Sequence, residues 1–484
     1  MATFNLVRNS RVFFTTNVSA GTGIVAASGF TTANSQELQV LDGFTFSQAS
    51  NADTISISEA GFTPNRGQRA FNTSLNNVEF SFSTYIRPFA DTGKVKAEES
   101  HLWNALLSST ALGATPAFTA NGLDTTAILF VNGLLTLPGL AMNVANISAG
   151  DVVVIKGVVG SNASQFNTAA RVITATAISV VLEYLTVPTG AKSNTDWSST
   201  VTFTKTAWND YAAVTANTAR PSAYSQATTA LSNKNQLLAF GMVITVDGVT
   251  YVIDNCALDQ AVVDFGLDGI AMVAWTGKGT ALRQLATNVN YSTATDPALT
   301  GSLLGTIAGK NTVANFITNK LSTISLISNI GGVSGTSYNL ALTGGSITIA
   351  NNITYVTPAN LGVVNVPIGY YTGTRAVSGS VTAYLRTGTT NSAGLLSNLL
   401  AASATSAGVE PKFQMIIAIG GSISGTRVEL QADGAMLQIP TIDAQAVMST
   451  TINFTAQGTV AAQSATSGYD IENSNDLEVR YFSL

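Results

Sequence analysis

The sequence predicts a mainly β protein with two tandem β-sandwich or barrel modules, each flanked by an α-helix, and one small inserted β domain. Most of the chain consists of short apolar or alternating runs rich in Val, Ile, Thr, Phe and Tyr, separated by Gly, Asn and Asp, which is typical of strands and turns. Strand and helix motifs of the first half recur in the second half. A stretch of domain size interrupts the first copy of the repeat.

The repeat is defined first by two helices and the strands that precede them. The helices are predicted at residues 100–109 (SHLWNALLSS) and 393–401 (AGLLSNLLA), where leucines recur at helical spacing. The strands before them, 78–87 (VEFSFSTYIR) and 377–386 (VSGSVTAYLR), match at an offset of 299 residues, and the helices match at an offset of 293. The intervening loop is therefore six residues shorter in the second copy.

A long hairpin extends the repeat. Residues 237–266 align without gaps to the segment that begins at Ile416, at an offset of 179, and Trp275 of WTGKG then falls on Phe454 of FTAQG. The order of elements, namely strand, helix and long hairpin, is the same in both halves. We interpret this as an internal duplication.

The change of offset from 293 to 179 measures an insertion of 114 residues in the first copy. We predict a first module at residues 1–110 and 233–295, an inserted β domain at 111–232, and a second module at 296–484. Within the insert, residues 150–185 have the pattern of four short strands in a small barrel or sandwich. The polar exit of the insert is linker-like, although a short helix is an alternative there.

The composition argues against several classes of function. Hydrophobic residues make up 45% of the 484 positions and charged residues only 10%, against roughly 25% charged residues in ordinary soluble domains. We therefore expect a chain that is buried in an assembly. A net charge of -5 argues against a protein that holds nucleic acid through counterion release.

Residues for catalysis or metal binding are scarce. One cysteine, Cys256, and one histidine, His101, exclude a disulfide framework, a thiolate zinc site and a His-rich metal cluster. His101 lies in a predicted helix beside Trp103, and we interpret it as a helix-face histidine near a ring or domain interface. Cys256 lies in an apolar strand, so we interpret it as a packing residue. The WTGKGT motif lacks the first glycine of a phosphate loop, because that position is Met272. The pair Asp264 and Asp268 lacks the aromatic platform expected of a glycosidase. We expect no enzymatic activity and no cofactor.

Neither a membrane span nor a secretory signal is predicted. The most apolar run, residues 127–144, is interrupted by Asn132, Gly133 and Pro138, which favours a hairpin with an Asn-Gly turn. The N-terminus lacks the apolar core that precedes a signal-peptide cleavage site.

Several segments closely resemble the major tail tube protein of long-tailed bacteriophages, in particular the T-five-like type with two tube modules per chain. These segments are NLVRNSRVFF near the N-terminus, residues 58–89, the helix HLWNALLS, the strand at 378–385, and ANNITYVTP at 350–358. The resemblance covers about residues 2–107 and 235–458. It departs from that type in its larger insert, and we expect no counterpart of the immunoglobulin-like domain that follows the second module there.

The resemblance implies a structural virion protein, the major tail tube subunit, whose tube-type β-sandwich module occurs twice per chain. Three chains would close a homotrimeric, pseudo-hexameric ring, and rings would stack around a central channel for DNA passage during genome ejection. If four strands per module face the channel, about 24 strands give a backbone diameter of about 50 Å. Implied partners are further copies of the chain and other tail proteins such as the tape measure, the terminator, and the baseplate or sheath. DNA would pass without specific binding, and assembly would occur in the host cytoplasm. A virion-surface adhesin or decoration protein, to which the insert would belong, is the alternative.

Four aspartates are candidates for the channel wall: Asp254, Asp264, Asp433 and Asp443. They recur at matching places on the two hairpins, without a cationic neighbour in sequence. Ordinary aspartates on solvated strand faces would explain the pattern equally well. In a tube, an acidic or neutral wall would let DNA slide. The face that each side chain occupies depends on strand register, because a shift of one residue reverses it.

Overall fold

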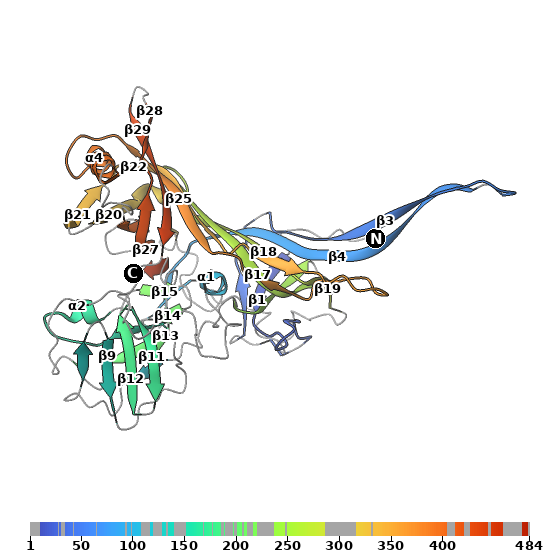
Figure 1. The fold of residues 1–484 in the computed structure, drawn as a ribbon, viewed down its shortest axis with the longest axis horizontal. Helices are drawn as coiled ribbons and strands as arrows, with labels where there is room; N and C mark the ends of the chain where they lie inside the picture. The colour runs from blue at the N-terminus through green and yellow to red at the C-terminus, as the bar shows by residue number, and fades with distance from the viewer. Residues whose placement is uncertain are drawn as a thin grey trace.

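The computed structural model confirms a mainly β fold (Figure 1). The structure describes residues 10–27, 29–30, 34–41, 43–63, 65–91, 94–97, 99–107, 117–119, 128–131, 134–139, 152–167, 169–176, 178–184, 188, 197, 201–205, 208–210, 216–219, 237–246, 249–285, 316–330, 333–403, 412–420, 426–443, 447–457 and 477–482. Within these residues no helix is long and apolar enough to span a membrane.

The described part of the first repeat is a two-layer sandwich flanked by helix α1 (Ser100–Leu107). Its outer sheet pairs, in order, β2 (Ser35–Leu38), β1 (Ser10–Thr15), β16 (Phe240–Val246), the first half of β17 (Val249–Gly266) and β19 (Ala281–Gln284). The facing layer, called the main sheet here, pairs β3 (Thr45–Glu59), β4 (Asn65–Tyr85), β18 (Met272–Gly279) and the second half of β17. A small hairpin of β5 (Phe89–Asp91) and β6 (Lys94–Lys96) precedes the helix. The long strand β17 thus belongs to both layers.

The second repeat has the same order of elements. Its outer sheet pairs β21 (Val333–Asn339), β20 (Thr323–Ile330), β26 (Lys412–Ile419), the first half of β27 (Arg427–Leu437) and β30 (Glu478–Phe482). Its part of the main sheet pairs β22 (Leu342–Ala350), β25 (Ala376–Tyr384), β29 (Ser449–Gln457), and then the end of β27 and β28 (Thr441–Asp443). The predicted second helix is α4 (Ser392–Ser403). A 3-10 turn, η6 (Asn319–Leu321), precedes β20.

Strand register establishes which residues of the two repeats correspond. Each hairpin carries a β-bulge between equivalent pairs: Phe240↔Cys256 and Met242↔Ile253 in the first repeat, Phe413↔Ala435 and Met415↔Ala432 in the second. The second strands of the hairpins therefore match at the predicted offset of 179. The gapless alignment was wrong for the first strands, which match at an offset of 173, because the turn of the second hairpin is six residues longer.

The rows of paired residues across the main sheet confirm the offset of 299 for the strands before the helices. The equivalent rows are Tyr85↔Met272↔Asp264 and Tyr384↔Ser449↔Asp443. The same pairing aligns Trp275 with Ile452, so the predicted match of Trp275 to Phe454 was wrong by two residues. Both Trp275 and Ile452 are fully buried.

One aromatic–glycine pair is exchanged between the repeats. Phe80 pairs with Gly277 in the first repeat, and the equivalent positions are Gly379 and Phe454 in the second. A Cβ at Gly277 would lie 2.3 Å from the Phe80 ring, and a Cβ at Gly379 would lie 2.7 Å from the Phe454 ring. In each repeat the phenylalanine ring therefore covers the glycine of the neighbouring strand. The ring fills the same core volume in both repeats, but it comes from the opposite strand of the pair.

The two repeats share one main sheet and one core. The second half of β17 pairs antiparallel with β22, from Gln260↔Ala350 to Gly266↔Gly344. Eight strands therefore run in the order β3-β4-β18-β17-β22-β25-β29-β28. Apolar side chains of both repeats form one continuous cluster beneath them. Among the described pairings, the outermost strands β3 and β28 are each paired on one side only.

The insert forms its own sheet and its own core. The sheet order is β7 (Ala117–Thr119), β13 (Thr202–Lys205), β10 (Val152–Lys156), β11 (Ala169–Thr176), β12 (Ser179–Tyr184), β9 (Leu134–Pro138) and β8 (Leu129–Val131). Antiparallel pairing of β8 and β9 confirms the predicted hairpin there. The segment predicted to hold four strands contains β10, a short helix α2 (Ala163–Phe166), β11 and β12. A separate apolar cluster includes Phe166, Tyr184 and Trp197.

The exit of the insert rejoins the duplicated body. β14 (Trp208–Asp210) pairs with β15 (Ala216–Ala219), and β15 pairs with β30 at the end of the second repeat. The boundaries at 110, 232 and 295 stay predictions. The short helix considered for the insert exit, within residues 215–235, falls largely at residues 220–235, outside the described residues.

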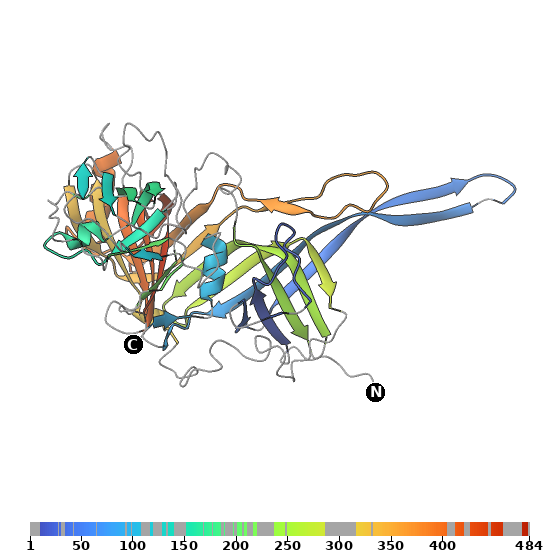
Figure 2. The ribbon, with the colours of Figure 1, turned by 90° about the horizontal axis from the view of Figure 1, so that it is seen from below.

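Two hairpin arms project from the main sheet in the same direction (Figures 1 and 2). The first arm is the extension of β3 and β4, and Phe62 at its tip is fully exposed. The second arm, residues 351–375, contains β23 (Thr354–Val356) and β24 (Gly369–Tyr371) and exposes Leu361. The arms touch where the Leu75 N–H donates to the Asn365 carbonyl at 2.8 Å.

Helix α1 is held beneath the main sheet by aromatic contacts. Trp103 packs edge-on against Trp275, with ring centroids 4.8 Å apart. Its indole N–H donates to the Tyr481 hydroxyl of β30 at 2.6 Å, and both side chains are fully buried. Burial raises the pKa of Tyr481 well above its usual value, so the hydroxyl stays protonated. The last strand of the chain is thereby joined to the first repeat.

Replacing Tyr481 with Phe should destabilise the protein by about 1–3 kcal/mol, because the buried indole N–H of Trp103 loses its acceptor. The free energy of unfolding from denaturant titration measures this. Tyr371→Phe is the matched control, since Tyr371 is 54% exposed, and it should change stability by less than about 0.5 kcal/mol. Equal stabilities for the two variants would contradict the assigned role of the hydrogen bond.

Candidate functional site: the open face of the main sheet

The main sheet has one buried face and one open face. In β18 the side chains alternate between exposed and buried, with Val273 and Trp275 directed into the core. Directly paired residues of neighbouring strands lie on the same face of a sheet. The alternation in β18 therefore shows whether each residue paired with β18 lies on the buried or the open face. The pairs of the next strands extend this result across the main sheet of both repeats.

The open face is lined mostly by small hydroxyl side chains. Its Ser and Thr residues are Thr45, Ser47, Ser81, Ser83, Thr276, Ser346, Thr348, Ser378, Ser380, Thr382, Thr441, Ser449, Thr451 and Thr455. Its charged side chains are Glu79, Asp264, Lys278 and Asp443. The face is thus polar, weakly charged and more acidic than basic, in agreement with the low charge content of the whole chain.

Two of the four candidate aspartates lie on this face at equivalent positions. Asp264 and Asp443 are both exposed and occupy the matching rows of the two repeats. Asp433 lies in β27 at the position equivalent to Asp254.

Asp254 has a different environment, inside the outer sheet of the first repeat. Its carboxylate is buried and accepts from Arg283 Nε at 2.5 Å and from the Val25 N–H at 2.8 Å. Arg283 also donates to the Val25 carbonyl at 2.5 Å. This ion pair joins β17, β19 and the loop after β1, so Asp254 serves the packing of the sheet and is not on the open face.

Glu79 is an acidic residue of the open face that the sequence repeat did not reveal. It pairs directly with Lys278 of β18, and its equivalent in the second repeat is Ser378. Glu79 therefore does not belong to a pair of acidic residues that recurs in both repeats. The alternation of β4 would have identified it, since Glu79 lies between the core positions Val78 and Phe80.

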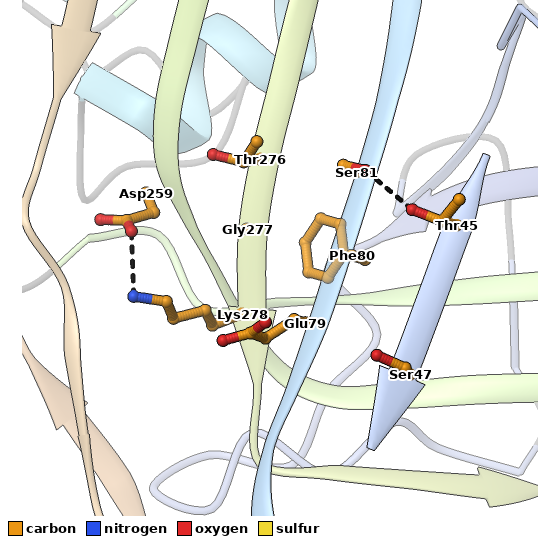
Figure 3. A pocket seen from close by; sticks show the side chains of 9 residues that line it. All are labelled: Thr45, Ser47, Glu79, Phe80, Ser81, Asp259, Thr276, Gly277 and Lys278. Atoms are coloured by element: carbon orange, nitrogen blue, oxygen red, sulfur yellow. Dashed lines mark hydrogen bonds and ion pairs between the residues drawn. The ribbon is translucent and has the colours of Figure 1, made fainter. Parts of the chain in front are cut away.

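A shallow depression of about 320 Å³ crosses the open face of the first repeat (Figure 3). It is lined by Thr45, Ser47, Glu79, Phe80, Ser81, Asp259, Thr276, Gly277 and Lys278. Across it, the hydroxyls of Thr45 and Ser81 are hydrogen-bonded at 2.8 Å. The depression holds one ion pair and several hydroxyls, a set that is suited to hydration more than to tight binding of an anion.

The ion pair of the depression also holds the two repeats together. Lys278 Nζ lies 3.0 Å from Asp259 Oδ2 and donates to the Ile353 carbonyl at 3.0 Å. Asp259 Oδ1 accepts from the Ile353 N–H at 2.7 Å. The Asn351 side chain beside it donates to the carbonyls of Leu106 and Leu258. The base of the second arm is thus anchored on the first repeat at the end of the β17–β22 pairing.

The residues considered for catalysis are packing residues in the described structure. His101 lies on α1 with its ring 5.7 Å from Phe14, and burial lowers the pKa of His101 to about 4. The Cys256 thiol is fully buried and donates to the Ile253 carbonyl at 3.3 Å. In the described part of the chain, no group of three or more His, Cys, Asp or Glu residues is arranged to hold a metal ion.

Comparison with known proteins supports the resemblance seen in the sequence. No family model matches the chain. The tail tube protein pb6 of Escherichia phage T5 is 28% identical over 460 residues, which cover 93% of this chain and 72% of pb6. The similarity thus extends over both repeats and the insert.

Replacing Asp259 with Ala should loosen the base of the second arm, since the Ile353 N–H loses its acceptor and Lys278 loses its carboxylate partner. Hydrogen bonds to charged groups contribute about 1.5–3 kcal/mol, so amide exchange at Ile353 should become roughly 10- to 100-fold faster. Asp264→Ala on the same strand is the control. Hydrogen exchange of a peptide spanning residues 351–356 measures the effect, and unchanged exchange in Asp259→Ala would show that the ion pair does not hold the arm.

Proposed function

We propose that this chain is the structural subunit of a bacteriophage tail tube, a virion protein that conducts DNA and performs no chemical turnover. The similarity to a tail tube protein over 93% of the chain carries the proposal. The duplicated β-sandwich and the continuous main sheet support it physically, because a sheet with two unpaired edges can be extended by further copies.

Three copies of the chain form a closed ring with six repeats. Within one chain the repeats associate head to tail, since β17 at one edge of the first repeat's part of the main sheet pairs with β22 at the opposite edge of the second repeat's part. A head-to-tail contact that closes on itself gives a ring. Eight strands per chain give about 24 strands in all, and at about 4.8 Å per strand and a tilt near 45° the backbone diameter is about 50 Å. This leaves room for a DNA duplex after side chains are subtracted.

The open face lines the channel. Ser and Thr hydroxyls are uncharged, so they bind water and make only neutral hydrogen bonds to phosphates. A wall with few cations does not retain DNA by counterion release. Asp264, Asp443 and Glu79 repel phosphates within about a Debye length, roughly 8–10 Å at physiological salt. DNA therefore slides past without specific binding, and the wall acts through its shape and charge.

The remaining surfaces serve assembly. The arms carry exposed apolar side chains at their tips and project beyond the main sheet, in the position expected for contacts between stacked rings. The insert, with its own core, lies outside the ring wall. Other tail proteins, such as the tape measure, the terminator, and the baseplate or sheath, contact the ends and surface of the tube in the virion.

Negative-stain electron microscopy of the purified chain tests the proposal, with hollow tubes of uniform bore as the expected result. A variant that lacks residues 117–205 but keeps β14 and β15, because β15 pairs with β30, should form tubes of the same bore and a thinner wall. Soluble oligomers that bind cells or glycans would instead support the surface adhesin or decoration protein.

Lysines on the open face should slow DNA release. Ser81→Lys with Ser380→Lys adds one cation at the same position of each repeat, and DNA release from virions carrying this variant should slow several-fold at low salt and less at high salt. Asp264→Lys should act in the same direction. The control, Ser161→Lys with Thr174→Lys, makes the same change of charge at exposed positions of the insert. Wild-type release rates at low ionic strength in variants that assemble normally would contradict the electrostatic role of the wall.

A further inference from the structure

The two ends of the main sheet expose apolar residues whose equivalents are buried at the contact between the repeats. Val263 of β17 and Ile347 of β22 pair directly and are both 0% exposed. Ile442 of β28, the equivalent of Val263, is 46% exposed, and Phe46 of β3, the equivalent of Ile347, is only partly buried. An apolar residue on the core side of a sheet is costly to leave in water. These two edges are therefore incomplete in the single chain.

Strand register within each repeat determines how the edges would meet. Thr45 pairs with Ser81, and Ser346 pairs with Ser380. Because Ser81 and Ser380 are equivalent at the offset of 299, Thr45 of β3 corresponds to Ser346 of β22. On the other edge, Asp443 corresponds to Asp264.

We infer that β28 of one copy of this chain pairs antiparallel with β3 of the next copy, in the register of β17 with β22. The observed pairs Asp264↔Ser346, Val263↔Ile347 and Val262↔Thr348 correspond to Asp443↔Thr45, Ile442↔Phe46 and Thr441↔Ser47 between two copies. This assignment rests on the proposed function and specifies its subunit contact residue by residue. The partner is a second copy of the chain, because the first repeat already holds the second in this way.

The chemistry of the two edges agrees with this register. Ile442 and Phe46 lie on the core side of their strands, where each covers the other, as Val263 and Ile347 do within the chain. Asp443, Thr45, Thr441 and Ser47 lie on the open side, so the hydroxyl and acidic lining continues across the subunit boundary without a break. A shift of one residue would place Asp443 opposite Phe46 and direct the carboxylate into the core.

Disulfide cross-linking tests the register. In a Cys256→Ala background, Thr45→Cys with Asp443→Cys places one thiol on each edge. Paired residues of antiparallel strands have Cα atoms about 4.5–5.5 Å apart, within the range of a disulfide. Mild oxidation of assembled protein should produce covalent dimers and trimers on denaturing gels, reversible by a reductant, with the trimer as the largest closed species.

Two further pairs are controls. Asp264→Cys with Ser346→Cys should form the equivalent disulfide inside one chain and give an oxidised monomer of altered mobility. Ser47→Cys with Asp443→Cys is two residues out of register and should give at least tenfold less cross-linked trimer. More trimer from this second pair than from Thr45→Cys with Asp443→Cys would overturn the register.

A charged substitution tests the apolar contact independently. Ile442→Lys should leave a folded monomer that no longer forms rings, since the side chain is solvated in the single chain. Ile178→Lys on the insert, which is 67% exposed, should assemble normally. Tubes seen by electron microscopy without the predicted cross-link, or with Ile442→Lys, would overturn this contact and leave the proposed function standing. Absence of rings and tubes in the unmodified chain would overturn the proposed function itself.

Discussion

The pairing of β17 with β22 is the contact on which the rest of the molecule depends. It joins two sandwiches into one main sheet, places their apolar faces over one core, and orients both repeats with their open faces to the same side. Edge-to-edge pairing can do this because the backbone N–H and C=O groups that face the neighbouring strand gain partners, and the side chains on each face continue in register. Lys278, Asp259 and Asn351 then hold the end of this pairing against the base of the second arm.

The two repeats agree in strand pairing and bulge position more than in the identity of their residues. The bulge between Met242 and Phe240 recurs between Met415 and Phe413, although few of the surrounding residues are identical. The exchange of Phe80 and Gly277 for Gly379 and Phe454 shows the same principle in the core. A close-packed interior constrains the total volume of a pair of facing residues, and either strand can supply the larger side chain.

The two repeats differ in the residues that contact the second arm, the insert and helix α1. The first repeat accepts the base of the second arm with Asp259 and Lys278, whereas the equivalent positions of the second repeat hold Gln438 and Thr455, both exposed. The C-terminal strand β30 pairs with both β27 and β15, so the end of the second repeat also fixes the exit of the insert. Trp103 and Tyr481 extend this link to helix α1. Identical topology thus supports different contacts on its outer surfaces.

The sequence alone determined the mainly β class, the duplication, both flanking helices, and the equivalence of Asp264 with Asp443. These follow from local pattern and from recurrence along the chain, neither of which needs distant contacts. The tertiary structure decided the register of the first hairpin strands, the burial of Asp254 against Arg283, and the pairing of Glu79 with Lys278. Turn length and ion pairing with a residue 29 positions away are invisible to a gapless comparison, and the face of each strand residue follows from its neighbours across the sheet. For the same reason, the continuity of the main sheet across both repeats became visible only when β17 and β22, about 80 residues apart in sequence, were found side by side.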